Sequence, residues 1–469
     1  MINIFKNEWK GFLRNNVFIF FSSLFILCLV VVTYFGIIQN KKQIQSQIDA
    51  HNFVRAQWDE MDPSNPHSAA HFGTYAFKTN SVLHNLDDGI NSVTGVVLRL
   101  EGHKQNDVAF SEASQSITIS KFGKFKVSLL FQFIIPIFLI FLSFNTYTSE
   151  ISSGRLKLLL VQGNSLTKII FGKISSLLSL SIILLSLSMI IQLLFNYVQI
   201  DSDQLLRLSV FFMSYLAYYF IVISFTVLIS LISKNSTSAL SVTIITWLLW
   251  TIFLPKTIGN LTEYFTPLSS RFELKEQMHD DRSHGIDGHN PFDKRKSKLE
   301  NEVLAKYKVN SLSQLPINFA GLVMQADEEF GNEVWDKHYG NLYNKLEKQK
   351  KDYQFSGFIN PFASIQSLSM GTSGTDLLHH LNFLKQAEKY RRYFIKTLND
   401  EYAYGGSKTG ERGWKASNEF FRSIKDFRYN EVSFTSIYSK YIIDLLCLAF
   451  WILSITLSIF FLSKKPIVK

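Results

Sequence analysis

Six long apolar runs divide the chain, and each is close to the roughly 20 residues that a helix needs to cross a bilayer. We predict membrane-spanning helices at residues 17–38, 127–147, 174–198, 208–232, 238–258 and 438–462. The polar stretches 39–126 and 259–437 are too long for simple connections and carry apolar periodicity of their own. The pattern therefore predicts a polytopic membrane protein with a substantial folded part outside the bilayer.

Residues 1–16 precede the first run and have the pattern of an amphipathic helix. One face is apolar and carries Phe5, Trp9, Phe12 and Leu13. The opposite face is basic and carries Lys6, Lys10 and Arg14. We expect this helix to lie along the membrane surface, with a polar lead-in to the first span as the alternative.

The two polar stretches predict one helix-rich lobe with a small β element. Ile44, Ile48, His51 and Trp58 extend the helical period of the first span outward. Two long amphipathic helices are predicted from two further sets of apolar residues: Leu322, Ala326, Val334, His338, Leu342 and Leu346, then Leu377, Leu381, Leu384, Ala387, Phe394 and Leu398. Alternation within residues 93–100 and 116–120 predicts strands. The fold class is therefore an α-helical polytopic membrane protein with six transmembrane helices and this lobe.

Charge orients the predicted spans. The N-terminal segment, residues 148–173, the loop at Lys234 and the C-terminal tail together hold eleven Lys or Arg but only two acidic residues, Glu8 and Glu150. The short 199–206 loop on the other side holds Asp201 and Asp203. By the positive-inside rule both termini are cytoplasmic, and both polar stretches lie on the outer side.

Composition and local motifs argue against several classes of function. The net charge of +10 is not gathered into a basic and aromatic stripe, so we expect no nucleic-acid partner. The only cysteines, Cys28 and Cys447, lie inside apolar runs, which argues against a disulfide or a thiolate metal site. Residues 405–409 (GGSKT) lack the order of a phosphate-binding loop, so we predict no ATPase site and no cofactor bound by this chain.

Residues 148–173 form a short basic segment between two apolar runs, and this layout suits an elbow that presents a small helix. Gly154 follows Glu150 by four residues, a Leu-rich half-turn comes next, and Asn164 or Ser165 can cap a new helix. The simpler alternative is a connecting loop that only obeys the charge rule.

Six spans, the amphipathic N-terminal helix and this loop, with Glu150, Gly154, Leu158, Leu159 and Lys173, resemble the permease subunits of ABC-2-type transporters. In that family this loop is the coupling helix that rests in a groove of the ATPase subunit. The resemblance implies coupling residues Glu150, Gly154, Arg155, Leu158 and Leu159. At residues 162–164 (QGN) the chain departs from the proline that many members have.

The outer stretches resemble one subfamily more specifically, whose outer lobe is a domain of unknown function. The matching segments are residues 65–73 (NPHSAAHFG), 75–78 (YAFK), 289–291 (HNP) and 315–318 (LPIN). The resemblance implies a permease in the bacterial inner membrane, with the lobe in the periplasm. Its implied partners are an ABC ATP-binding subunit that holds ATP and Mg²⁺, a second identical or related permease, and a possible periplasmic protein. Implied functions are export, extraction or mechanical work on the outer side, and we expect Glu150→Arg to uncouple the complex without unfolding it.

Polar residues inside the spans are candidates for the membrane pathway. Gln132 and Pro136 lie in the second span and Gln192 in the third, where they line a pathway or satisfy a kink. Asp444, two turns into the last span, is costly there unless it faces a cavity or partner. We expect it to pair with Lys440 at i−4.

Two histidine groups suggest metal chemistry. His67 and His71 are spaced i, i+4, but two imidazoles make an incomplete zinc site, and Asn65 and Pro66 favour a structural helix start. His279, His284 and His289 lie among carboxylates in a segment that reads as a turn-rich loop, and they are the candidate metal ligands. A membrane-anchored outer metalloenzyme is therefore one alternative function. A ligand-binding sensor or scaffold is the other.

Overall fold

A computed structural model describes residues 1–109, 126–197, 199–286, 288, 290–411 and 413–464. Up to Ile232 its elements are α1 (Ile2–Arg14), α2 (Asn16–Asp59), α3 (Pro66–Phe72), β1 (Thr74–Phe77), α4 (Asn91–Thr94), β2 (Val97–Glu101), β3 (Lys104–Gln105), α6 (Val127–Leu129), η1 (Leu130–Ile134), α7 (Ile135–Ser143), α8 (Thr148–Ser152), α9 (Arg155–Val161), α10 (Leu166–Asn196) and α11 (Ser202–Ile232).

The remaining elements are α12 (Ser236–Leu248), η2 (Leu249–Phe253), α13 (Leu254–Phe265), α14 (Arg271–His284), α15 (Phe292–Tyr307), η3 (Leu312–Gln314), α16 (Phe319–Phe355), η4 (Ser356–Phe358), α17 (Pro361–Thr372), α18 (Leu377–Tyr404), α19 (Asn418–Ser423), α20 (Phe434–Ile437), η5 (Tyr438–Tyr441) and α21 (Ile442–Ser463).

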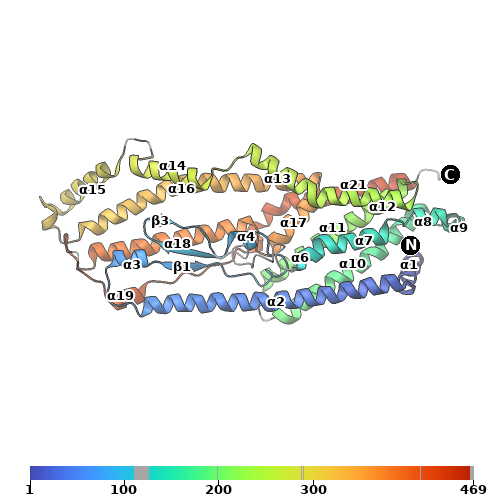
Figure 1. The fold of residues 1–469 in the computed structure, drawn as a ribbon, viewed down its shortest axis with the longest axis horizontal. Helices are drawn as coiled ribbons and strands as arrows, with labels where there is room; N and C mark the ends of the chain where they lie inside the picture. Colours follow the sequence, from blue (N-terminus) through green and yellow to red (C-terminus); the bar gives the residue numbers. More distant parts are fainter. Residues whose placement is uncertain (110–125, 198, 287, 289, 412, 465–469) are drawn as a thin grey trace.

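The predicted fold class is confirmed. Within the described residues, six helical segments are long and apolar enough to cross a membrane: Asn16–Asp59, Val127–Ser152, Leu166–Asn196, Ser202–Ile232, Ser236–Phe265 and Phe434–Ser463. The molecule is elongated, with the membrane bundle at one end and the lobe at the other (Figure 1). The α8–α9 segment, α1 and the end of α21 lie at the end of the bundle that faces away from the lobe (Figure 1).

Helix α2 connects the two parts of the molecule. It runs unbroken for 44 residues, along the bundle and then along the lobe (Figure 1). Asn15 caps its start, since the Asn15 side chain accepts hydrogen bonds from the backbone N–H groups of Val17 and Phe18. Its far end is fixed by Trp58, which is buried against Phe394 and Phe421 of the lobe. The predicted outward continuation of the first span is therefore present.

Two prolines inside spans are accommodated by π-helical turns. A proline cannot donate the N–H that the i−4 carbonyl expects, and its ring clashes with that carbonyl. The turns η1 and η2 directly precede α7 and α13, in which Pro136 and Pro255 are the second residues. Side chains from neighbouring segments serve carbonyls in these distorted turns: Tyr219 donates to Phe131, and Asn360 donates to Trp250. The carbonyl groups of Phe131 and Trp250 are thus hydrogen-bonded within the protein, which is necessary because lipid offers no hydrogen bonds.

The lobe combines both polar stretches around the packed helices α16 and α18. Strands β1, β2 and β3 form an antiparallel sheet in that order, and apolar side chains of β1 and β2 pack against α18. The strand predicted over residues 93–100 begins only at Val97. Residues up to Thr94 are helical, and Gly95, at φ 82°, ends that turn. The strand predicted over residues 116–120 lies outside the described residues.

A matched pair of glycine substitutions on α16 tests this packing. A Cβ on Gly321 would lie 2.6 Å from the backbone nitrogen of Ala403 in α18, whereas a Cβ on Gly340 would meet nothing within 4 Å. We expect Gly321→Ala to destabilise the protein by about 1 to 3 kcal/mol through overpacking. Gly340→Ala should leave stability unchanged or raise it by up to about 1 kcal/mol, because alanine favours a helix interior. Thermal unfolding in detergent measures both, and equal effects would contradict close α16–α18 packing.

Candidate functional site

The bundle end away from the lobe carries a compact helical elbow formed by α8 and α9. Gly154, at φ 72°, makes the turn between the two short helices, a conformation that costs glycine little. Gly163, at φ 83°, follows α9, and the Ser165 side chain then caps α10 by accepting from Lys168 N–H. The sequence signals for a short helix between two spans therefore correspond to this elbow.

A buried ion-pair cluster fixes the elbow to the bundle. Lys173 Nζ of α10 lies 2.9 Å from Glu150 Oε1 of α8 and 2.5 Å from Glu8 Oε1 of α1. Arg155 Nε adds a contact of 3.3 Å to Glu150 Oε2. Glu150 and Lys173 are each only 6% exposed. Glu150 is thus a structural group, and Glu150→Arg would test folding as well as coupling.

Three apolar side chains of the elbow are exposed. Ile151, Leu158 and Val161 are 46%, 65% and 88% exposed. Leu156 is buried and Leu159 packs partly against the bundle core. Of the five predicted coupling residues, Gly154, Arg155 and Leu158 are at the surface, Glu150 is buried and Leu159 is half-buried. Sequence reasoning missed Val161, although its position three residues after Leu158 places both on one helical face.

At the opposite end of the bundle, Asp87 of the lobe enters a buried hydrogen-bond network with two spans. Its Oδ2 accepts from Ser369 Oγ at 2.6 Å and from Gln132 Nε2 at 3.0 Å. Gln132 also donates to Tyr215 of α11 at 3.2 Å. Burial raises the pKa of Asp87 above its ordinary value, although these hydrogen bonds act against the rise. Gln132 therefore bridges the second span, the fourth span and the lobe.

A second junction is built around Arg207 of α11, whose side chain has no exposed surface. Its guanidinium lies 2.7 Å from Asp203 Oδ2, 3.6 Å from Glu431 Oε1 and 3.3 Å from His379 Nε2. His379 in turn contacts Asp376 at 2.7 Å. Sequence reasoning treated Asp203 only as a loop charge, although Arg207 stands at i+4 from it. The other partners of Arg207, His379 and Glu431, are more than 170 positions away along the chain and gave no local signal.

Asp376 is held ionised at this junction. Burial alone would raise its pKa, but the hydrogen bond with His379 and the nearby charge of Lys350 outweigh burial and hold the pKa well below its usual range. Tyr441 at the start of the last span donates to Asp376 Oδ2 at 2.9 Å. The lobe is thus attached to the fourth span through paired charges and to the sixth span through the Tyr441 hydrogen bond.

Asp444 does not have the partner expected from the sequence. Its Oδ2 accepts from Gln354 Nε2 at 2.5 Å and from Ser367 Oγ at 2.8 Å. The expected pairing with Lys440 is wrong, because the Lys440 side chain is 57% exposed and lies 3.7 Å from Glu347 of α16. Gln192 is also buried, and it accepts from Asn196 at 3.0 Å. A role for Gln132, Pro136, Gln192 and Asp444 in a membrane pathway stays a prediction.

The predicted metal ligands His279 and His284 lie on a helix and not in a loop. Helix α14 starts at a capping box between Ser270 and Glu273 and continues to His284 before Gly285 ends it. Five helical residues rotate the direction of the side chain by about 140°, so His279 and His284 point different ways. His284 pairs with Asp280 at 2.9 Å. His289 lies outside the described residues, and a shared metal role for the three stays a prediction.

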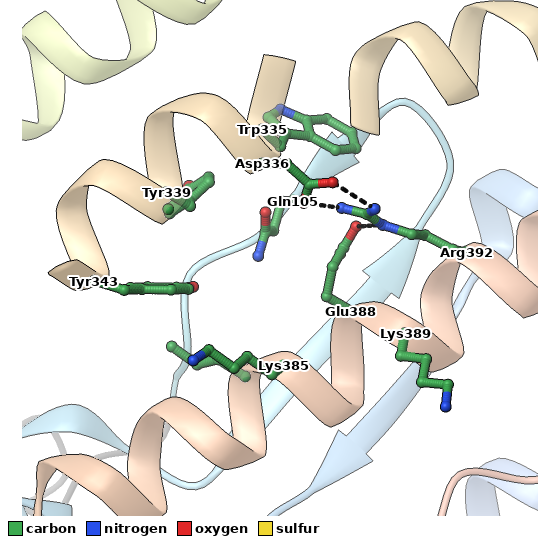
Figure 2. A pocket seen from close by; sticks show the side chains of 11 residues that line it. Gln105, Trp335, Asp336, Tyr339, Tyr343, Lys385, Glu388, Lys389 and Arg392 are labelled. Carbon is green, nitrogen blue, oxygen red and sulfur yellow. Dashed lines mark hydrogen bonds and ion pairs between the residues drawn. The ribbon is translucent and has the colours of Figure 1, made fainter. Parts of the chain in front are cut away.

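A cleft of about 390 Å³ lies on the lobe between α16 and α18 (Figure 2). Tyr339 and Tyr343 line one side (Figure 2). The guanidinium of Arg392 also lines the cleft. Its Nη2 lies 2.6 Å from Asp336 Oδ1, and its Nε lies 2.9 Å from Glu388 Oε1. Because these charges satisfy one another, the cleft offers no free guanidinium to an anionic ligand.

Comparison with known families matched two parts of the chain. Residues 63–267 match the family described as ABC-2 family transporter protein. Residues 271–430, which form most of the lobe, match Domain of unknown function (DUF3526). Neither the curated proteins nor the solved structures gave a match to the chain.

The buried cluster at the elbow predicts unequal effects for two lysines of α10. Lys173→Met would leave Glu150 and Glu8 without their shared cation, so we expect a loss of about 3 kcal/mol in stability. Lys168→Met removes an exposed lysine from the same helix and should change stability by less than about 0.5 kcal/mol. Thermal unfolding of the two purified variants makes the comparison, and an unaffected Lys173→Met variant would show that the cluster is dispensable.

Proposed function

Because the chain belongs to the ABC-2 family of transporter proteins, we propose that it is a permease subunit driven by a separate ATP-binding subunit. The chain would contribute no nucleotide site, and ATP and Mg²⁺ would be held by the partner. A second permease, identical or related, would complete the membrane part. The observation that carries the proposal is the exposed apolar face of the α8–α9 elbow.

That face has the properties of a docking surface. Ile151, Leu158 and Val161 are exposed on the α8–α9 elbow, which lies at the end of the bundle away from the lobe (Figure 1). Exposed apolar side chains gathered in one place mark interaction surfaces in proteins. The Glu150–Lys173–Glu8 cluster holds this surface firmly against α10 and α1. A force applied to the elbow would therefore reach two membrane-associated helices directly.

The distribution of Lys and Arg supports one orientation of the chain in the membrane. Residues 148–173 and the N-terminal helix hold seven of the Lys and Arg residues that the positive-inside rule assigns to the cytoplasm. The elbow would thus face the cytoplasm, where an ATP-binding subunit works. The lobe would lie on the periplasmic side of a bacterial inner membrane.

The route from elbow to lobe follows continuous structure. Helix α2 passes from the bundle into the lobe without a break, and α11 meets the lobe at Arg207. We propose that closure of the ATP-binding subunits tilts the spans and that these connections carry the movement to the lobe. The work done there would be export, extraction or the movement of a periplasmic partner. For such a movement to be driven, the two nucleotide states must differ in their contacts with the elbow.

The elbow face can be tested by one substitution. Val161→Asp places a charge on the most exposed apolar residue of α9, without disturbing the buried cluster. We expect at least a tenfold loss of the ATP-binding subunit that co-purifies with the chain in mild detergent. Mass spectrometry of material purified from the native host provides the measurement.

Phe272→Asp is the matched control, because Phe272 is a 76% exposed apolar residue on the lobe. It should retain the ATP-binding subunit at the wild-type level. The proposal fails if the wild-type chain purifies alone, or if a well-folded Val161→Asp variant keeps the full amount of the subunit.

A further inference from the structure

Three histidines from two separate elements meet on the lobe. His67 and His71 lie one turn apart on α3, and His103 lies in the turn between β2 and β3. One possible ligand atom from each residue lies within 4.8 Å of the others. The sequence shows only the first two, because His103 reaches them through the pairing of β1 with β2.

The spacing fits a small cation. His67 Nε2 and His71 Nε2 are 3.2 Å apart. Two nitrogens bound tetrahedrally to one zinc ion at 2.0–2.1 Å would lie ~3.3 Å apart. The ring centre of His103 is 5.3 Å from that of His67 and 5.2 Å from that of His71, so the third imidazole borders both. Residue His71 is exposed and the other two are half-buried, which leaves an approach from solvent.

A buried carboxylate orients the third imidazole. His103 Nδ1 lies 3.0 Å from Glu328 Oε1, and the backbone N–H of His103 donates to the same oxygen. His103 has a left-handed φ of 66°, which is uncommon for a residue other than glycine, so the contact with Glu328 accompanies a constrained backbone. With Nδ1–H donated to Glu328, the lone pair of His103 is on Nε2. This carboxylate–histidine arrangement is the one that supports metal-bound imidazoles.

Glu328 itself is held in place by an ion pair. Its side chain is 2% exposed, and Oε2 lies 3.0 Å from Arg391 Nη1 of α18. The histidine cluster is therefore supported by the two central helices of the lobe.

We propose that His67, His71 and His103 bind one divalent transition-metal ion of the zinc class. Imidazole nitrogen is a preferred ligand for Zn²⁺, whereas Mg²⁺ and Ca²⁺ prefer oxygen. Three protein ligands leave a fourth tetrahedral position for water or an exchangeable ligand. The ion would connect α3 to the β2–β3 turn and, through Glu328, to α16. The proposal is independent of the permease assignment, since it needs only the lobe side chains.

The test is metal binding by the full chain, purified in detergent without a polyhistidine tag and stripped with a chelator. We expect one Zn²⁺ per chain by elemental analysis after re-addition and removal of excess metal. Added Zn²⁺ should also raise the thermal unfolding midpoint, because a ligand bound only to the folded state stabilises it. Co²⁺ substituted into the site should give the intense visible absorption of a tetrahedral nitrogen-ligand site.

Variants locate the ion. His71→Ala removes an exposed ligand and should abolish both the stoichiometric zinc and the thermal shift, while the metal-free variant unfolds near the wild-type temperature. His103→Ala should do the same to zinc binding. His51→Ala is the control, since His51 belongs to neither group of candidate ligands and pairs with Asp426 at 2.7 Å, and this variant should bind zinc like wild type. The proposal is overturned if wild type binds no stoichiometric zinc, or if a folded His71→Ala variant retains it.

Discussion

The structure depends on the pairing of charges that are buried where the lobe meets the membrane bundle. An ionised side chain removed from water is stable only when opposite charges and hydrogen bonds replace its hydration. Arg207 has no exposed surface, and Asp203, Glu431 and the carbonyl of Val432 surround its guanidinium. Because these groups come from the fourth span and from the segment before the sixth, neither part can shift without separating charges. This constraint makes the junction a stiff connection.

The same requirement explains the irregular backbone inside the bundle. Lipid offers no hydrogen bonds, so each carbonyl released by a kink needs a partner from the protein. Tyr219 and Asn360 supply such partners at the two π-helical turns before Pro136 and Pro255. Asn360 is the cap of α17, so one side chain both starts that helix and completes the fifth span. At both kinks, therefore, a polar side chain from a neighbouring segment provides the hydrogen bond that the backbone carbonyl needs.

Local sequence patterns predicted the spans, the long lobe helices and the elbow, because each depends on periodicity or caps within about twenty residues. They could not predict partners that depend on tertiary contacts. Asp444 has a lysine at the right helical spacing, yet Gln354 and Ser367 reach it from other segments while Lys440 stays in solvent. His103 is joined to His67 and His71 only by strand pairing. The side chains of His279 and His284 point in different directions because α14 continues to His284, and the turn-rich sequence did not predict this helix.

The positions of the buried clusters suggest how movement passes through the molecule. One cluster, Lys173 with Glu150 and Glu8, binds the elbow to α10 and α1. The others, around Asp87 and Arg207, bind the lobe to the second and fourth spans. Between them α10 and α11 pack through apolar side chains, which resist separation. Charge pairs and hydrogen bonds at both ends of the bundle hold the elbow and the lobe to the spans. Under the proposed coupling, a displacement of the elbow would reach the lobe through these spans, with its charge pairs intact.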